Sequence, residues 1–446
     1  MESSTPFRSS SEVYQWIEGF INLERDIDSR PMKLEKMKKL AALSGNPEEC
    51  APAIHVAGSK GKGSVCAIAA SILKAAGYSV SRYASPHVHD FRERITLNNE
   101  FFSEEVYTEA GNELRRIAGK VDDSLKPLTF FELFTLWFFL CSRLSRCDVM
   151  VVETGLGGRL DATNIVTPLV SVITVIEKEH VKILGDSLDK IAFEKAGIIK
   201  NGRPLVLAEQ DPLALEVFRQ KVKETGSVLY YFPETAKIEN LKFDRNGSSF
   251  DLNVNTDHVN LVLKDLNIAI PGNIQVQNAA LAVLTVKTAF PSIGDSSTRS
   301  GLCTFKLPAR FEKLSDNPVI IIDGAHTALS ASECIGVFNK LYGKQGILLF
   351  GCAADKDASS IAALAVPGFS RIIITTPCNF KKSSPEDVFE CFKKRVEKVN
   401  AKTEILLISD TMLAYNAAFE QAVKCSTPIL VTGSFYLAAE VAGFYS

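Results

Sequence analysis

The sequence predicts an α/β protein with two domains, each built on a parallel sheet. Near the N-terminus, a glycine- and lysine-rich turn at 58–63 separates a short apolar strand from a helix. From residue 319 onward, apolar strands alternate regularly with helical stretches, which is typical of a parallel sheet covered on both faces. A chain of 446 residues is long enough to form full cores in two or three domains.

The composition is that of an ordinary globular protein, with 46% hydrophobic and 23% charged residues. A formal net charge of −2 gives no general attraction to nucleic acid or to anionic membranes. The ten cysteines are scattered without a CxxC pair, which indicates reduced thiols rather than a disulfide or zinc framework. The longest apolar stretch, 133–141, is shorter than a membrane span, and the N-terminus lacks a secretory apolar run. We therefore expect a cytoplasmic protein without nucleic-acid or membrane partners. We also expect a monomer, because no heptad pattern or exposed apolar stripe argues for assembly.

The N-terminal turn has the features of a nucleotide site. It lies between a predicted strand at 53–57 and a predicted helix at 63–76. A strand, a glycine turn and a helix N-terminus form an anion cradle, because free amides and the helix dipole face one point. We expect Lys62 to reach the outer phosphates and the Ser64 hydroxyl to hold Mg²⁺. The predicted nucleotide-binding residues of this P-loop are Gly58, Ser59, Lys60, Gly61, Lys62, Gly63 and Ser64.

The rest of the first half alternates between strands and helices. Predicted helices occupy 11–21, 31–44, 104–118, 130–144, 188–199, 212–225 and 275–290. The helix at 130–144 is apolar nearly all round, so we expect it to be buried. Predicted strands occupy 79–84, 148–153, 170–174 and 204–208, and short alternating stretches between 228 and 270 indicate a small antiparallel excursion with a hairpin turn at Asn246-Gly247.

Two residues near strand ends are candidate metal ligands. Glu153 ends the strand at 148–153, and acids at the carboxyl ends of parallel strands point into the ligand crevice, so it is a natural second Mg²⁺ ligand. His180 follows the strand at 170–174 and is a credible ligand, although a lone histidine is more often structural. The glycine run after Glu153 is not a dinucleotide fingerprint, because its third glycine position holds Leu160, so NAD binding is disfavoured.

A polar run at 294–300 separates the two halves. We expect a nucleotide-binding domain at 1–296, a linker at 297–310 and a Rossmann-like domain at 311–446. Five strands of this second domain (VIIIDGA, GILLFGCA, RIIITTP, EILLIS and PILVTGS) alternate with helices around 328–341, 384–398 and 411–424. The domain lacks GxGxxG and therefore need not bind a dinucleotide.

Eight motifs taken together resemble those of folylpolyglutamate synthases and dihydrofolate synthases, within the Mur-ligase superfamily. Their order and approximate spacing are kept from about residue 14 to the C-terminus. The superfamily's GxxGKGS variant, with Gly63 between Lys62 and Ser64, is among them. The motifs are HVAGSKGKGS (55–64), SPHVHDFRERI (85–95), LTFFE (128–132), ETGLGGRLDATN (153–164), EKAGIIK (194–200), LPARFE (307–312), DGAH (323–326) and DKD (355–357).

The resemblance implies a P-loop ATPase domain, a C-terminal Rossmann-like domain and a cleft between them that holds the active site. It implies ATP-dependent addition of L-glutamate to a folate or to dihydropteroate through an acyl phosphate. It also implies two metal sites: Ser64 and Glu153 at the first, and Glu153 with His180 at the second. Lys195 matches a lysine that the family carbamylates, which would make it a metal ligand.

Further site residues also follow from the resemblance. Asn278, Arg310 and Asp323 match positions that contact ATP, and His326 lies where the family places glutamate or the transferred phosphate. The predicted catalytic residues are therefore Lys62, His180, Lys195 and His326. The folate side would be formed by Ser85, Pro86, His87, Arg92, Arg94, Phe130 and Phe131, although simple core packing explains the phenylalanine pair equally well.

Four departures from the family pattern stand out in the sequence. Ser59-Lys60 replaces Thr-Asn or Thr-Lys, Glu179 stands where Asp usually precedes the histidine, and Ala309 replaces a glycine. Thr327 replaces the asparagine of DGAHN, which bears on the glutamate side of the site. None removes a group that the chemistry requires.

Two other functions compete with the folate–glutamate ligase. Another Mur-type amide ligase would share the phosphate loop, but FRERI and LTFFE argue against it. A degenerate nucleotide-binding scaffold would not need to retain Lys62, Glu153 and Lys195.

Overall fold

The computed structural model describes residues 5–22, 34–122, 125–377 and 383–445. They divide into two compact units, each described by itself below. Unit 1 contains the described residues of 1–241, 249–267 and 275–305, and unit 2 those of 242–248, 268–274 and 306–446. Within the stretch 297–310, predicted as a linker, residues up to Thr304 belong to helix α11 (Asp295–Thr304).

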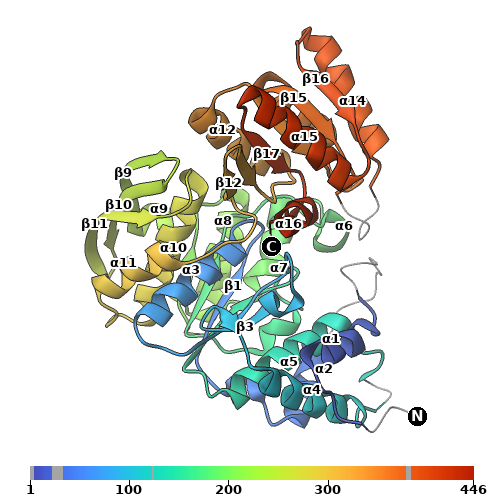
Figure 1. Cartoon of the computed structure of the whole chain (residues 1–446). Coiled ribbons are helices and arrows are strands. Elements are labelled where there is room, and N and C mark those ends of the chain that lie inside the picture. Colours follow the sequence, from blue (N-terminus) through green and yellow to red (C-terminus); the bar gives the residue numbers. More distant parts are fainter. Residues whose placement is uncertain (1–4, 23–33, 123–124, 378–382, 446) are drawn as a thin grey trace. The chain divides into compact units, whose positions relative to one another are not determined.

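An eight-stranded sheet in the order β4-β3-β2-β5-β1-β6-β7-β8 forms the centre of unit 1 (Figure 1). Strand β1 lies between β5 and β6 and runs parallel to both, whereas β3 and β4 are antiparallel to their neighbours. Because parallel strands end at the same edge, the segments after β1, β5 and β6 gather there. The strands are β1 (Ala53–Ala57), β2 (Val80–Tyr83), β3 (Ile95–Leu97), β4 (Glu100–Phe101), β5 (Val149–Glu153), β6 (Val170–Ile173), β7 (Leu205–Leu207) and β8 (Leu229–Tyr231).

Helices cover this sheet. The helices predicted at 104–118, 130–144 and 212–225 are confirmed with the same bounds, and α1 is shorter than predicted. Of the helix predicted at 31–44, residues 31–33 lie outside the described residues. The helices are α1 (Ser10–Glu18), α2 (Leu34–Leu43), α3 (Lys62–Ala75), α4 (Glu104–Ala118), α5 (Phe130–Leu144), α6 (Val181–Leu184), α7 (Leu188–Ala196), α8 (Pro212–Thr225), α9 (Phe232–Thr235), α10 (Asn273–Ala289) and α11, with 3-10 turns at Pro47–Glu49, Phe91–Arg94 and Ala162–Ile165.

Helix α5 is buried on all sides, as predicted. Its N-terminus is closed by a capping box between Thr129 and Glu132. One face packs on the sheet, with the Phe138 and Tyr83 ring centroids 5.1 Å apart, and another packs on α4, where the Trp137 and Tyr107 centroids are 5.4 Å apart. This aromatic core anchors β2 and β5 and therefore the segments that leave their carboxyl ends.

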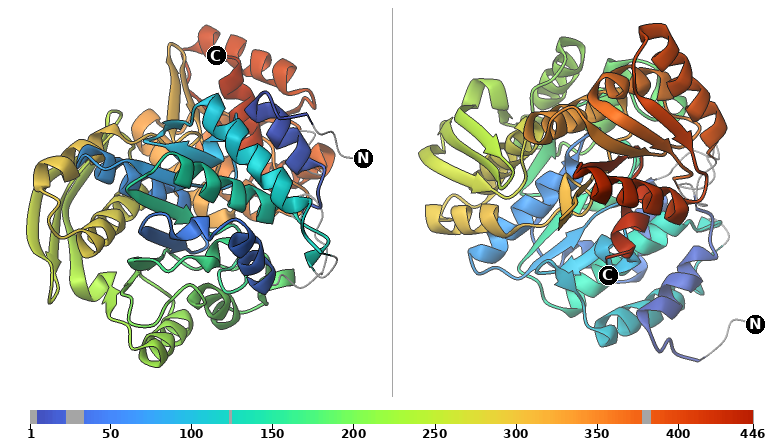
Figure 2. Two further views of the ribbon diagram at one scale, coloured as in Figure 1. Left: turned by 90° about the horizontal axis from the view of Figure 1, so that it is seen from below. Right: turned by 45° about the horizontal axis from the view of Figure 1, so that its top comes forward.

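A separate three-stranded sheet in the order β11-β10-β9 follows β8 (Figure 2). Its strands are β9 (Ala236–Asp244), β10 (Gly247–Asn255) and β11 (Asn260–Ile268). The predicted hairpin turn corresponds to the β9–β10 connection, where the Asp244 carboxylate accepts a hydrogen bond from the Asn246 amide at 2.7 Å.

Unit 2 is built on a six-stranded sheet in the order β12-β13-β17-β14-β15-β16. The pairs from β13 to β16 are parallel, which confirms the predicted alternation. The antiparallel edge strand β12 was not predicted, because its sequence EKLSD is polar and only partly buried. The elements are β12 (Glu312–Asp316), β13 (Val319–Ile322), α12 (Ala328–Tyr342), β14 (Gly346–Phe350), α13 (Ala358–Ala365), a 3-10 turn (Val366–Gly368), β15 (Phe369–Ile374), α14 (Pro385–Val399), β16 (Glu404–Leu407), α15 (Thr411–Cys425), β17 (Ile429–Thr432) and α16 (Phe435–Gly443). None of the helices in the described part of the chain is long and apolar enough to span a membrane.

The packing of α5 leads to a stability prediction. Phe138→Ala removes a fully buried ring and should lower the free energy of unfolding by about 3–5 kcal/mol. Phe193→Ala, at a ring that is 58% exposed, should lower it by less than about 1 kcal/mol. Denaturant unfolding measures both, and equal losses would contradict the assignment of α5 to the core.

Candidate active site

The loop between β1 and α3 approaches its neighbours so closely that two positions require glycine. Gly58 has φ +143°, and an added Cβ would stand 1.8 Å from Thr174 Oγ1. Gly61 has φ +90°, and an added Cβ would stand 2.4 Å from Asn278 Oδ1. The loop is therefore held between the end of β6 and helix α10, and any side chain at these positions would displace it.

Hydrogen bonds fix this loop further. The amides of Ser59 and Lys60 donate to the Val175 carbonyl at 2.9 and 3.3 Å, and Ser59 Oγ donates to the Glu177 carbonyl at 3.0 Å. Lys62 begins α3, and its ammonium group donates to the Gly58 carbonyl at 3.0 Å. The lysine thus lies over its own loop at the N-terminus of a 14-residue helix, where an anion is favoured.

The Glu153 carboxylate lies beside the start of α3. It ends β5, is 3% exposed and accepts a hydrogen bond from the Ser85 amide at 3.2 Å. A Cβ built on Gly63 would lie 3.4 Å from Glu153 Oε2. Ser64, in the first turn of α3, is likewise 3% exposed. The structure thus brings the two residues predicted for the first metal site, Ser64 and Glu153, to the N-terminus of α3.

The Ser64 hydroxyl and the Glu153 carboxylate suit an Mg²⁺ ion that is also bound by a nucleotide. Mg²⁺ is usually bound by one or two carboxylates, with phosphates and water completing its shell. Among the described residues, no group of three or more His, Cys, Asp or Glu side chains could form a metal cage. One carboxylate and one hydroxyl therefore fit a cation whose remaining ligands are nucleotide phosphates and water.

A buried ion pair lies beneath the loop. Lys195, in α7, is 1% exposed and donates to the Gly58 carbonyl at 2.7 Å and to Glu179 Oε1 at 3.0 Å. Burial and the charge of Lys62 lower the pKa of Lys195 to about 8, although Glu179 opposes this shift. Burial alone would raise the pKa of Glu179, but the charges of Lys62, Lys195 and Lys60 outweigh it and hold it at about 2. In the sequence Glu179 stands out only as a departure from the family pattern. In the structure it is the ion-pair partner of Lys195.

His180 follows Glu179 but occupies a different environment. Its side chain is exposed, and its backbone is left-handed (φ +46°) directly before α6. Glu179, the residue before it, contacts the Lys195 ammonium group.

A polar network that the sequence did not predict holds the chain after Glu153. The buried Asp161 carboxylate accepts hydrogen bonds from the amides of Gly155 and Leu156 at 3.0 and 2.9 Å. Thr163 Oγ1 donates to Asp161 at 2.5 Å and therefore accepts from His55 Nε2 at 2.9 Å. Burial lowers the pKa of His55 to about 3, so its ring is neutral with the proton on Nε2. His55 and Asp161 thus position the loop that follows Glu153.

Three of the predicted folate-side residues form one cluster. Arg94 is 3% exposed, its Nε donates to His87 Nδ1 at 2.8 Å, and its guanidinium lies 5.5 Å from the Phe130 ring centroid. Phe130 is 1% exposed and belongs to the core of α5, which supports the packing interpretation for this ring.

The other folate-side residues lie elsewhere. Arg92 is held by Asp90 at 2.7 Å and Glu104 at 3.3 Å. Phe131 is half-buried, and its ring packs on the backbone of Gly155. Ser85 joins Glu153, as described above, and Pro86 is exposed. The structure therefore divides this predicted group between the Glu153 side, the Arg94 cluster and the edge near Glu104.

The remaining nucleotide candidates are distributed over both units. In unit 1, Asn278 Nδ2 donates to Gln275 Oε1 at 3.2 Å and lies against Gly61. In unit 2, the Arg310 guanidinium lies 3.9 Å from the centroid of the Phe435 ring, a cation–π contact. Asp323 accepts hydrogen bonds from the amides of Phe311 and Ala325 at 2.8 and 2.7 Å.

Two departures from the family pattern lie in unit 2. Ala309 has φ +53°, in the left-handed region that favours glycine, so the glycine expected there would fit with less strain. Thr327 is the N-cap of α12 and exchanges hydrogen bonds with Ser330. The ring of His326 is held by a 2.8 Å hydrogen bond between Nδ1 and the Gly324 carbonyl.

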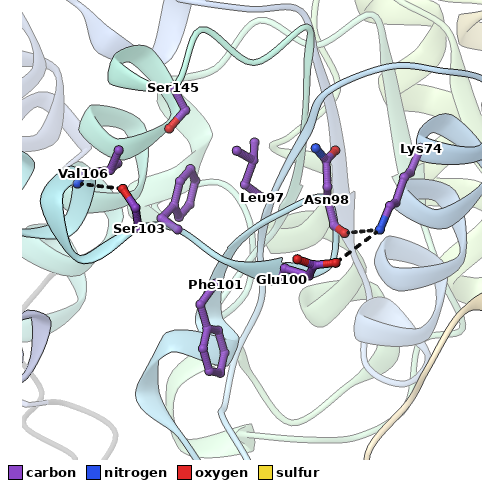
Figure 3. A pocket seen from close by; sticks show the side chains of 9 residues that line it. Lys74, Leu97, Asn98, Glu100, Phe101, Ser103, Val106 and Ser145 are labelled. Atoms are coloured by element: carbon purple, nitrogen blue, oxygen red, sulfur yellow. Dashed lines mark hydrogen bonds and ion pairs between the residues drawn. The ribbon is translucent and has the colours of Figure 1, made fainter.

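A surface hollow of about 420 Å³ lies at the other end of α3 (Figure 3). Lys74 reaches across it to the Asn98 carbonyl at 2.8 Å and to Glu100 at 3.8 Å. Its lining contains none of the predicted site residues and consists of Lys74, Leu97, Asn98, Glu100, Phe101, Phe102, Ser103, Val106 and Ser145.

The chain is similar to known proteins along nearly its whole length. Residues 126–286 match the Mur ligase middle domain, and residues 309–435 match the Mur ligase glutamate ligase domain. The chain is 32% identical to a folylpolyglutamate synthase of Lacticaseibacillus casei over 97% of each sequence. It is 33% identical to a dihydrofolate synthase/folylpolyglutamate synthase of Bacillus subtilis, over 78% of this chain and 81% of that protein.

A solved structure shares the fold. An FPGS–AMPPCP–folate complex superposes with a TM-score of 0.81 and 30% identity, over 97% of this chain and 98% of that chain. This likeness confirms the predicted α/β architecture.

The ion pair of Lys195 leads to an electrostatic prediction. Glu179→Gln removes the charge that raises the pKa of Lys195, so that pKa should fall further below about 8. The pH dependence of Lys195 labelling by an amine-reactive reagent, read by mass spectrometry, measures it. Glu194→Gln, on the same helix as Lys195 but paired with Arg159, is the matched control and should leave the pKa unchanged. An unchanged pKa in Glu179→Gln would contradict this account.

Proposed function

This chain belongs to the folylpolyglutamate synthase/dihydrofolate synthase family of Mur ligases, and we infer that it is an ATP-dependent ligase that adds L-glutamate to a pterin substrate. The acceptor would be a folate, dihydropteroate or both, joined through an amide bond. The observation that carries this inference is the convergence of Lys62, Glu153 and Lys195 on the ends of β5 and β1 and the start of α3. A similar protein is known as a complex with AMPPCP, an ATP analogue, and folate.

The chemistry explains why the site is rich in cations. A carboxylate is a poor electrophile, so its oxygen first attacks the γ-phosphorus of ATP, which forms an acyl phosphate and releases ADP. The amine of glutamate then attacks the acyl carbon, and the C–O bond to phosphate breaks to give the amide, inorganic phosphate and a proton. Both steps place negative charge on phosphate oxygens, so the protein must supply positive charge rather than a nucleophile.

The residues of unit 1 divide this work. Lys62 and the amides of Gly58 to Ser64 would bind the β- and γ-phosphates at the N-terminus of α3. When bound, Mg²⁺ neutralises phosphate charge, and Ser64 and Glu153 would hold it. We further propose that Glu153, His180 and Lys195 hold a second metal ion. The Asp161 network keeps the chain after Glu153 in place, so this carboxylate is oriented before the substrate binds.

The ammonium group of Lys195 cannot bind a metal ion, whereas a carbamate on the same nitrogen would offer the anionic oxygens that Mg²⁺ prefers. We propose that Lys195 is carbamylated: the neutral amine attacks CO₂, a C–N bond forms and a proton is released. Its burial and its pKa of about 8 support this proposal, because an appreciable fraction of the amine is then neutral near pH 7.5.

Labelling with ¹³CO₂ tests the carbamate. We expect a carbamate carbon signal in the protein, absent in Lys195→Ala and retained in Lys200→Ala. Lys200 is the matched control, because burial also lowers its pKa to about 8. A signal that disappears with Lys200 instead, or no signal at all, would contradict the proposal.

The remaining assignments rest on the resemblance. We propose that Asn278, Arg310 and Asp323 contact ATP, that His326 contacts glutamate or the transferred phosphate, and that Ser85, Pro86, His87, Arg92, Arg94, Phe130 and Phe131 serve the folate side. We also propose that the protein acts as a cytoplasmic monomer.

ADP release by the purified protein with Mg·ATP and L-glutamate tests the function. Turnover with dihydropteroate alone would make the protein a dihydrofolate synthase, turnover with tetrahydrofolate alone a polyglutamylating enzyme, and turnover with both a bifunctional enzyme. A folded protein that binds ATP but turns over with neither acceptor would contradict the folate assignment and favour another carboxylate–amino acid ligase of the Mur type.

The phosphate loop leads to a mutational prediction. Lys62→Ala removes the cation at the N-terminus of α3 and should lower kcat for ADP release by about 10²–10³-fold. Lys74→Ala is the matched control, because Lys74 lies in the last turn of the same helix, and its kcat should stay within about two-fold of wild type. A Lys62→Ala enzyme within a few-fold of wild type would show that the phosphate site is wrongly assigned.

A further inference from the structure

Two cysteines meet at the amino ends of β1 and β5. Cys50 precedes β1 by three residues, and Cys147 precedes β5 by two. The strands are parallel neighbours in which Ala53 lies opposite Met150, so the segments that lead into them lie side by side. The side chains confirm this placement, because the two thiols share a hydrogen bond and Cys50 Sγ lies 3.9 Å from Met150 Sδ.

The two thiols differ in access. Cys50 is exposed at the surface, whereas Cys147 is only 7% exposed. Arg143, held by the Ser44 carbonyl at 2.5 Å and by Glu113 at 2.7 Å, places a fixed positive charge near Cys50. In such an arrangement the exposed thiol beside the cation is oxidised first. The buried second thiol then reacts with the oxidised sulfur to form a disulfide.

The electrostatics agree with this division. The hydrogen bond from Cys147 lowers the pKa of Cys50, and Arg143 adds to this effect against the opposing effect of burial. The same hydrogen bond and burial raise the pKa of Cys147. Cys50 is therefore the thiol with more thiolate character, and Cys147 stays protonated.

We propose that Cys50 and Cys147 form a peroxide-sensitive, reversible disulfide. The Cys50 thiolate attacks hydrogen peroxide, the O–O bond breaks, and sulfenic acid and hydroxide form. The Cys147 sulfur then attacks the sulfenic sulfur, the S–O bond breaks, and the thiol proton leaves with the hydroxyl group as water. Because the two thiols already share a hydrogen bond, their sulfurs need to move only a short way to reach the S–S bond length of about 2.05 Å.

The position of the pair determines its effect. Gly58 and Glu153 lie at the opposite ends of β1 and β5, and five strand residues span roughly 16 Å. The disulfide would therefore tie together the two strands that carry the phosphate loop and Glu153 without entering the site. It closes a long loop of chain, so it should raise the midpoint of thermal unfolding. Ligase turnover should stay within two-fold of that of the reduced protein.

Peptide mapping tests the proposal. The full chain is treated with one equivalent of hydrogen peroxide, alkylated and digested. We expect a peptide linked through Cys50 and Cys147 that dithiothreitol separates. Cys147→Ser should stop at the Cys50 sulfenic acid, which dimedone traps, and Cys50→Ser should give neither product. Cys303→Ser is the matched control, because Cys303 is also exposed but contacts the Asn267 carbonyl, and it should leave the linked peptide unchanged.

Three results would overturn the proposal. One is the absence of the linked peptide while Cys303 and Cys425 are oxidised. Another is a Cys147→Ser protein in which dimedone labels Cys50 no faster than these two exposed thiols. The last is a ligase turnover that falls in proportion to the fraction of protein that carries the disulfide. The disulfide would then affect the active site, although it lies at the opposite ends of the two strands.

Discussion

The carbonyl oxygen of Gly58 is the point on which the rest of the site depends. It accepts hydrogen bonds from two lysines, Lys62 at 3.0 Å and Lys195 at 2.7 Å, and so joins β1, α3 and α7. Two ammonium groups at one oxygen repel each other, and each lowers the free energy of placing an anion nearby. Glu179 pairs with Lys195 and offsets part of this charge. Lys62 is thereby held at the N-terminus of α3, where its ammonium group and the helix end together favour the negative charge of nucleotide phosphates.

Most of the fold could be predicted from local sequence patterns, because these patterns arise when one helix or strand buries its own apolar side chains. Helix α5 was predicted with the correct bounds from an apolar run, and β1 and β5 from short apolar stretches between turns. The elements that were missed lack such a pattern. The edge strand β12 has a polar sequence, and its pairing with β13 is set by tertiary contacts. Helices α13 and α16 are short and rich in small residues, which leaves little periodicity to detect.

The site was predicted in the same uneven way. Lys62 and Glu153 stand in local motifs, so their place at strand and helix ends could be inferred from the sequence. The contact of Lys195 with Gly58 joins residues 137 positions apart, so no local sequence pattern predicts it. The network of His55, Thr163 and Asp161 was hidden for the same reason, although each residue lies within a recognised motif. Sequence motifs thus named the participants, and only the fold revealed which residues hold the others in place.

The central claim is that this cationic site transfers the γ-phosphoryl group to the acceptor carboxylate. Isotope transfer tests it most directly, with an acceptor whose reacting carboxylate carries ¹⁸O in both oxygens. If an acyl phosphate forms, one ¹⁸O atom appears in each inorganic phosphate released and the other stays in the new amide. Phosphate without ¹⁸O, or ¹⁸O recovered in AMP, would contradict the account, because the acceptor oxygen would then never have bonded to the γ-phosphorus.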